Sequence, residues 1–245
     1  MCRKIPTLLI VGLAVVACAR TAQADLIGEY KVGDGTDYWV TAEATIGGDT
    51  LTITLTNKAT AAVTPDIVHA LSGFYFDWSG DPLTLTSFTG GTGDLYNNPV
   101  AQGTTPPTYQ LSLAQAGADL RYGWGFGQTT TGMYGLSAIG GYDPWKVNDG
   151  KAYYGAKLDG ADYLIIGSQT VADGLGTLKP PPSDFLILDE ATFMLLVPTG
   201  TPLSAISNPV FTFGTGPDIV TPLPGAVLLG FLGLGYAGMK LRKHA

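Results

Sequence analysis

Cysteine and histidine are almost missing from this chain of 245 residues. Its only cysteines are Cys2 and Cys18, so removal of an N-terminal leader would leave none. Disulfides, cysteine nucleophiles and cysteine-ligated zinc sites are then excluded. His69 is the only histidine between residues 25 and 220, and no G-x-S-x-G motif accompanies it, so a serine hydrolase is not indicated.

Charge is also scarce, at 13% of residues, and it is unevenly placed. Residues 25–220 contain all 20 acidic residues but only seven of the 13 basic ones, which gives them a formal charge of −13. Such a surface repels phosphate groups, so we exclude nucleic acids as partners. No long run has apolar residues at helical spacing, so long helices are not expected.

The chain has instead a series of short runs in which apolar residues and threonine alternate. In Leu51–Asn57, "LTITLTN", the pattern predicts a strand with leucine and isoleucine on one face and threonine on the other. Similar runs, rich in threonine, aromatic and branched residues, predict strands at 73–78, 82–88, 108–114, 163–167, 191–197 and 209–215.

Clusters of glycine, aspartate and asparagine between these runs are typical of turns, among them "TGGTGD" and "YNNP". Residues 112–120 are rich in alanine, and we expect one helical turn or a loop there. Many short strands joined by such turns predict an all-β domain over residues 25–220. Its expected architecture is an antiparallel β-sandwich of the jelly-roll or Greek-key type.

Residues 1–24 have the three parts of a secretory signal peptide, which are a basic start, a short apolar segment and small residues before the cut. Cleavage is expected between Ala24 and Asp25, with Ala22 as the second small residue. The alternative is lipoprotein processing at Cys18, which follows an acceptable lipobox. Both alternatives predict export from the cytoplasm.

Two glycine loops, "DGTD" and "DGAD", are the candidate cation sites, because each places two carboxylates three residues apart. The four residues are Asp34, Asp37, Asp159 and Asp162. Calcium takes several oxygen ligands from such loops, so it is the one cofactor considered. Plain Asp-Gly turns are the alternative explanation, and neither loop has the spacing of an EF-hand.

An acid pair for sugar hydrolysis is the remaining route to an enzyme. The glutamates Glu29, Glu43 and Glu190 and the 17 aspartates show no local pattern that selects two of them. We therefore expect a protein without catalytic residues, with a secreted hydrolase as the weakest alternative.

Residues 121–145 are unusually dense in glycine and aromatic residues. The aromatic residues considered for sugar contact are Trp124, Phe126, Tyr134, Tyr142 and Trp145. An exposed row of such rings would stack on sugars and favour a carbohydrate-binding module. Packing in the core or over glycine-rich strands is the alternative for the same residues.

The chain ends in "TPLPGAVLLGFLGLGYAGMKLRKHA", which combines two prolines, an apolar run and a basic cluster. Residues 226–239 would form a helix of about 21 Å, which is only marginally long enough to span a membrane. The basic residues that would hold the end on the cytoplasmic side are Lys240, Arg242 and Lys243. This order predicts a weak, temporary membrane anchor.

Residues 221–245 resemble the PEP-CTERM sorting tail in its VPLP-type variant. The residues that carry the motif are Thr221, Pro222, Leu223, Pro224 and Gly225, with leucine where the usual motif has glutamate. The resemblance implies processing by an exosortase, a membrane-embedded, cysteine transpeptidase-like enzyme of Gram-negative bacteria that produce exopolysaccharide.

Five segments of residues 51–215 also resemble, in the same order, one family of exosortase-dependent surface proteins. They are "LTITLTN", "ALSGFYFDWSG", "YGLSAIGGYD", "LDGADYLI" and "ISNPVFTFGT". This second resemblance implies an exported surface or matrix protein with no known catalytic residues.

Taken together, these features predict a protein that uses the Sec machinery and signal peptidase and is held briefly in the inner membrane. After exosortase processing it would reach the cell surface, the outer membrane or the extracellular matrix of a biofilm. Its expected role is structural or adhesive, with extracellular polysaccharide as a candidate partner. A carbohydrate-binding module is the main alternative.

Overall fold

The computed structural model describes residues 24–32, 38–59, 70–102, 108–140, 144–158, 163–167, 185–214 and 218–220. These residues form twelve β-strands of one hydrogen-bonded sheet, with short 3-10 turns and no α-helix among them. The predicted all-β class is therefore confirmed. The two-layered sandwich stays a prediction, and the sheet is mixed rather than purely antiparallel.

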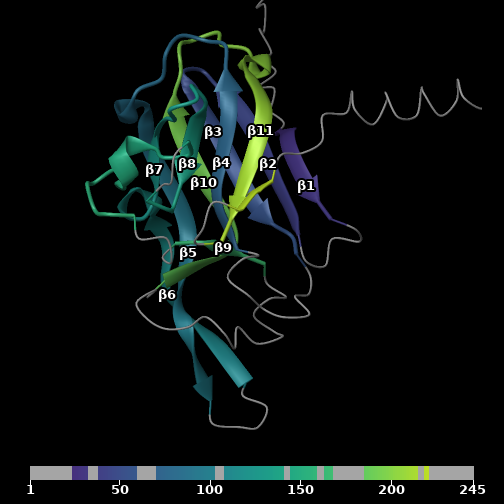
Figure 1. Ribbon diagram of the computed structural model, residues 1–245, viewed down its shortest axis with the longest axis vertical. Helices are drawn as coiled ribbons and strands as arrows, with labels where there is room; N and C mark the ends of the chain where they lie inside the picture. The colour runs from purple at the N-terminus through teal and green to yellow at the C-terminus, as the bar shows by residue number, and fades with distance from the viewer. Residues whose placement is uncertain are drawn as a thin grey trace, which may run out of the picture.

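The strands follow the order β1-β2-β3-β10-β9-β4-β11-β12, with β5 and β6 branching from β10 and with β7 and β8 branching from β4 (Figure 1). Their bounds are β1 Asp25–Lys31, β2 Trp39–Gly47, β3 Thr50–Asn57, β4 Leu71–Trp78, β5 Phe88–Gln102, β6 Thr108–Asp119, β7 Gly125–Gln128, β8 Tyr134–Ser137, β9 Ile165–Ile166, β10 Phe185–Leu196, β11 Ile206–Phe213 and β12 Asp218–Val220.

Strand β9 is short but has a particular place in this order. It runs parallel to β10 over two residues and meets β4 through a single antiparallel pair, Leu71 with Ile165. Within the described residues, this is the backbone connection between the β1-β2-β3-β10 part of the sheet and the β4-β11-β12 part. The parallel pair also makes the sheet mixed.

Strand β3 follows its sequence pattern. Leu51, Ile53 and Leu55 are fully buried, and the threonines between them are half-exposed on the other face. On that face the hydroxyl of Thr54 lies 3.2 Å from the hydroxyl of Thr192 in the neighbouring β10. The predicted alternation of faces is confirmed.

Other expected strands at 73–78, 108–114, 163–167, 191–197 and 209–215 coincide, wholly or in part, with β4, β6, β9, β10 and β11. The prediction of a strand at 82–88 is wrong, because this segment is coil followed by a 3-10 turn over Leu85–Ser87. The backbone N–H of Thr84 donates to Ser87 Oγ (3.1 Å), and Ser87 N–H donates back to the Thr84 carbonyl (2.9 Å). These local bonds replace a strand ladder.

Two expectations about irregular structure are also corrected. Strand β5 runs through the glycine-rich cluster that was expected to form turns, and β6 continues to Asp119 through the alanine-rich residues expected as a loop or helical turn. The β5 glycines make room for large neighbours, since a Cβ at Gly90 would lie 2.7 Å from Met194 Cε. Close packing, and not chain reversal, explains glycine in this strand.

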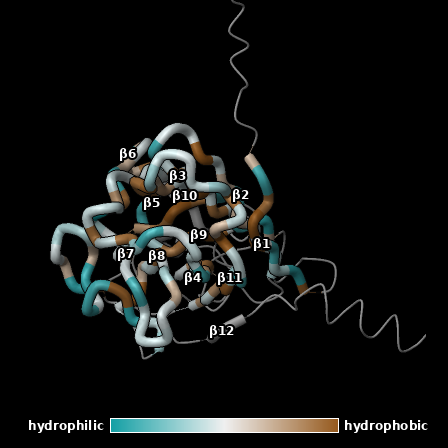
Figure 2. Tube along the Cα trace, turned by 90° about the horizontal axis from the view of Figure 1, so that it is seen from above, coloured by the Kyte–Doolittle hydropathy of each residue, from teal (hydrophilic) through white to brown (hydrophobic). Residues whose placement is uncertain are grey.

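The sheet curls until its first strand packs against β11. A Cβ at Gly28 of β1 would lie 2.8 Å from Pro209, and the rings of Tyr30 and Tyr38 lie 5.8 and 5.0 Å from that of Phe213. Seen from above, the strands surround a largely apolar interior (Figure 2). The curl thus encloses one main hydrophobic core.

Strand β4 is buried on both faces. Phe74 and Phe76 belong to the main core, whereas Tyr75 points to a second, smaller cluster with Val147 and Val210. The Tyr75 hydroxyl donates to the Trp145 carbonyl at 3.0 Å, and burial raises the pKa of Tyr75 to about 12. The loop over residues 144–147 therefore closes a second buried layer over the sheet.

Candidate functional site

The aromatic residues expected to contact sugar do not form an exposed row in the described structure. Trp124 is fully buried, its indole Nε1 donates to the Tyr163 carbonyl (3.1 Å), and its ring packs 4.8 Å from that of Phe193. Phe126 is fully buried as well, and the Tyr134 hydroxyl accepts a bond from the Leu83 N–H at 3.1 Å inside the core. These side chains serve packing.

Trp145 also faces inward, with its ring 4.8 Å from that of Tyr75. Tyr142 lies outside the described residues. A planar platform made of Trp124, Tyr134 and Trp145 is thus not present, because each of these rings packs against another buried aromatic ring.

The structure brings a different set of aromatic side chains to the surface. We call it the tyrosine cluster, and it consists of Asp119, Arg121, Tyr122, Tyr153 and Tyr154. Tyr122 and Tyr154 are 59% and 48% exposed, and their ring centroids lie 4.6 Å apart at an interplanar angle of 41°. Tyr153 meets the edge of Tyr154 at 5.2 Å.

An ion pair forms the polar side of the tyrosine cluster. Arg121 Nε donates to Asp119 Oδ1 at 3.0 Å, and Nη2 donates to Oδ2 at 2.8 Å. The guanidinium carbon also lies 5.0 Å from the ring centroid of Tyr154, within reach of a cation–π contact. The hydrogen bonds from Arg121 lower the pKa of the Asp119 carboxyl below its ordinary value.

The ion pair gives a pH-dependent contribution to stability. Because the pKa of Asp119 is lowered on folding, the contribution is present above the ordinary value and is lost as the pH falls through the lowered one. The pair is partly exposed, so we expect less than about 1 kcal/mol. Asp119→Asn should lower the melting temperature by at most about 2–4 °C at neutral pH and by less near roughly pH 3.

Thermal melts of the two proteins across that pH range measure the difference. Asp81→Asn is the matched control, because this exposed carboxylate makes no ion pair in the described structure. A difference between Asp119→Asn and wild type that stayed constant with pH would contradict the assignment.

Backbone bonds hold the tyrosine cluster in place. Tyr153 N–H donates to the Trp124 carbonyl (3.1 Å), and Tyr154 N–H donates to the Arg121 carbonyl (3.4 Å). The turn after them uses Gly155 at φ 86°, a conformation that glycine adopts without strain. Two segments some 30 residues apart in the sequence are therefore fixed side by side.

The remaining candidate residues are largely outside the described structure. These are the calcium candidates Asp34, Asp37, Asp159 and Asp162, together with His69, the tail residues Pro222, Leu223, Pro224 and Gly225, and the basic residues Lys240, Arg242 and Lys243. Among the described residues, no group of three or more side chains of the His, Cys, Asp and Glu types could hold a metal ion. In the same part of the chain, no helix is long and apolar enough to cross a membrane.

Of the three glutamates, Glu190 shares a shallow depression with another carboxylate, that of Asp94. Asp94 Oδ1 accepts a hydrogen bond from the Gly117 N–H at 2.8 Å, so this bond to β6 explains where the Asp94 carboxylate lies. Glu29 accepts a bond from Trp39 Nε1 at 2.9 Å, and Glu43 lies on β2. The sequence alone could not pair Asp94 with Glu190, because β5 and β10 are far apart in the chain.

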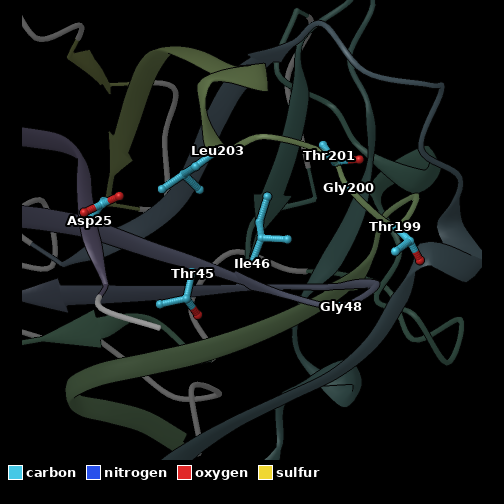
Figure 3. Close-up of a pocket in the computed structure, with 8 residues that line it drawn as sticks. All are labelled: Asp25, Thr45, Ile46, Gly48, Thr199, Gly200, Thr201 and Leu203. Atoms are coloured by element: carbon cyan, nitrogen blue, oxygen red, sulfur yellow. The ribbon is translucent and has the colours of Figure 1, made fainter. Parts of the chain in front are cut away.

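A second depression, of about 440 Å³, lies between the β2–β3 hairpin and the turn before β11 (Figure 3). Asp25 is at its edge, and its other lining residues are Thr45, Ile46, Gly48, Thr199, Gly200, Thr201 and Leu203. The lining offers hydroxyl groups and one carboxylate but no histidine, lysine or cysteine. It therefore has the chemistry of a polar surface hollow.

Comparisons with family models, with curated proteins and with solved structures gave no match.

Proposed function

We propose that this protein is exported, processed by an exosortase and placed at the cell surface or in the extracellular matrix, where it has a structural or adhesive role. The observation that carries the proposal is the order of parts in residues 221–245, a proline motif followed by a short apolar segment and a basic end. A sorting device gives each of these three parts a purpose.

The positions of the first and last strands support this proposal. Strand β1 begins at Asp25, directly after the expected signal-peptide cut, and the preceding Ala24 is exposed. Strand β12 ends at Val220, the last residue before the sorting tail. Within the part of the chain that the structure describes, the first and last strands therefore lie just inside the two expected cuts.

The architecture proposed for this body is a β-sandwich. The packing of β1 on β11 and the burial of both faces of β4 support it, since a curled sheet with apolar contacts across its interior has the layers of a sandwich. A folded β-domain of this kind suits the proposed structural or adhesive role.

The proline motif provides the sharpest test. Replacing Pro222 and Pro224 by alanine should leave an unprocessed protein in the inner membrane, because the apolar segment remains while the cleavage motif is lost. Deletion of the host exosortase should have the same result. Truncation after Pro224 should instead release an exported body that is never sorted.

Cell fractionation with intact-mass measurement distinguishes these outcomes and locates both cuts. Pro82→Ala, a change at an exposed proline outside the tail, is the matched control and should be processed normally. Wild-type protein that retained "LRKHA" at its C-terminus in the outer membrane or medium would refute the proposal.

A further inference from the structure

We propose that the tyrosine cluster is a binding site for neutral polysaccharide, with Tyr122 and Tyr154 as the stacking residues and Arg121 as the hydroxyl-binding residue. The inference rests on the adhesive role proposed above, to which it adds a ligand class. It does not depend on how the tail is processed.

The tyrosine cluster presents exposed aromatic rings. Tyr122 and Tyr154 are the two most exposed aromatic residues among the described large apolar side chains, and they lie in contact with each other. Neighbouring exposed rings on a well-packed domain mark an interaction surface more often than a single exposed residue does. Tyrosine also loses little side-chain entropy on binding, since it has only two rotatable bonds.

The side chains of the tyrosine cluster are held in place before any ligand binds. The two tyrosines come from segments that backbone bonds join, and Arg121 lies over the rings of Tyr153 and Tyr154. Gly123, next to Tyr122, is held against the ring of Tyr163, so that no side chain fits there. A ligand would meet rings whose positions are already fixed, which reduces the entropic cost of binding.

The side chains of the tyrosine cluster match the chemistry of a neutral sugar. A pyranose ring with equatorial hydroxyls has flat C–H faces, which suit an aromatic ring, and hydroxyls at its edge, which need donors and acceptors. Asp119 uses the Nε and Nη2 groups of Arg121, so both hydrogens of Nη1 stay without a partner among the described residues. The tyrosine rings thus match the flat C–H face of such a sugar, and the guanidinium of Arg121 matches the hydroxyls at its edge.

The charges in and around the tyrosine cluster disfavour an anionic ligand. Asp119 neutralises Arg121 locally, and residues 25–220 carry a formal charge of −13. An anionic polymer would therefore be repelled by the body without meeting a free cation at the tyrosine cluster. Neutral hexose polymers are the ligand class that the site favours.

Affinity electrophoresis tests the proposal with the full-length chain, purified in a detergent that has no sugar headgroup. Native gels would contain hydroxyethylcellulose, galactomannan or, as the anionic comparison, alginate. We expect retardation by at least one neutral polymer, and at least about tenfold weaker apparent binding for the Tyr122→Ala/Tyr154→Ala double variant. Leu196→Ala is the matched control, because it removes a similarly exposed apolar side chain on β10.

Melting temperatures identify any variant that has lost its fold. If the double variant is unfolded, the binding of Tyr122→Ala is compared with that of Tyr122→Phe instead. The proposal is overturned if neither neutral polymer retards the wild type, if the double variant binds as well as the wild type, or if only alginate binds. It is also overturned if the tyrosines are needed only for a concentration-dependent dimer, which sedimentation would detect. The assay uses purified chain, so a failed tail experiment leaves its result intact.

Discussion

Replacing Ile53 by aspartate should unfold the domain or lower its melting temperature drastically. Ile53 is fully buried in the centre of β3, where a carboxylate would have neither water nor a positively charged partner. A buried, unpaired charge is expected to cost at least about 4 kcal/mol, much of the stability of an ordinary domain. Thermal or urea denaturation followed by circular dichroism measures the loss.

Thr52→Asp is the control for this prediction, because Thr52 is a neighbour on the same strand but faces the half-exposed side. It is a better control than Thr54, which lies opposite Glu43 in the sheet, where a new carboxylate would meet a like charge. We expect Thr52→Asp to cost about 1 kcal/mol or less. Similar melting temperatures for the Ile53 and Thr52 variants would contradict the assignment of faces in β3.

The second large effect is expected at Gly135. This residue pairs with Tyr75 across β8 and β4, and a Cβ there would collide with Cδ1 of the tyrosine ring. The ring cannot move aside, because Tyr75 is fully buried and its hydroxyl is bound to the Trp145 carbonyl. Overpacking of this kind makes Gly135→Ala cost about 3 kcal/mol or more.

Gly47→Ala is the matched control, because a Cβ at this position of β2 would meet no atom within 4 Å. It should leave the free energy of unfolding nearly unchanged. If both alanine variants unfolded at the same urea concentration, this result would contradict the close contact between Gly135 and Tyr75.

Sequence patterns predicted β3, β4, β6, β9, β10 and β11 wholly or in part, but they did not predict β1, β2, β7, β8 or β12. In β3 the alternation of threonine with leucine and isoleucine identifies both the strand and its inner side. The same reasoning failed in β5, where a cluster of glycines predicts a turn. Glycine also occurs within strands, where its lack of a side chain leaves room for a large neighbouring side chain such as that of Met194. The prediction of a strand at 82–88 failed because hydrogen bonds between the sequence neighbours Thr84 and Ser87 form a 3-10 turn in spite of the alternating pattern.

The aromatic residues show a similar limit. Composition marked residues 121–145 as unusual, but it could not distinguish the buried Trp124 from the exposed Tyr122, two positions away. Tyr154 lies outside that segment and joins Tyr122 only through backbone bonds between the two segments. The only indication of the exposed pair in the sequence is that Tyr154 stands between a second tyrosine and a turn glycine, which is a weak pattern.

The short β9 has a consequence for a protein that is pulled from its C-terminal side. A load applied at β12 passes by backbone hydrogen bonds to β11 and β4, and then reaches β10 through the single pair of Leu71 with Ile165 and the two-residue parallel pairing of β9. Within the described sheet this is the thinnest part of the route. Under shear, the backbone hydrogen bonds between the two parts should therefore break first at β9, while the covalent link over residues 197–205 and the packing of β1 on β11 still join them. The buried rings of β4 and β11 keep the C-terminal part together.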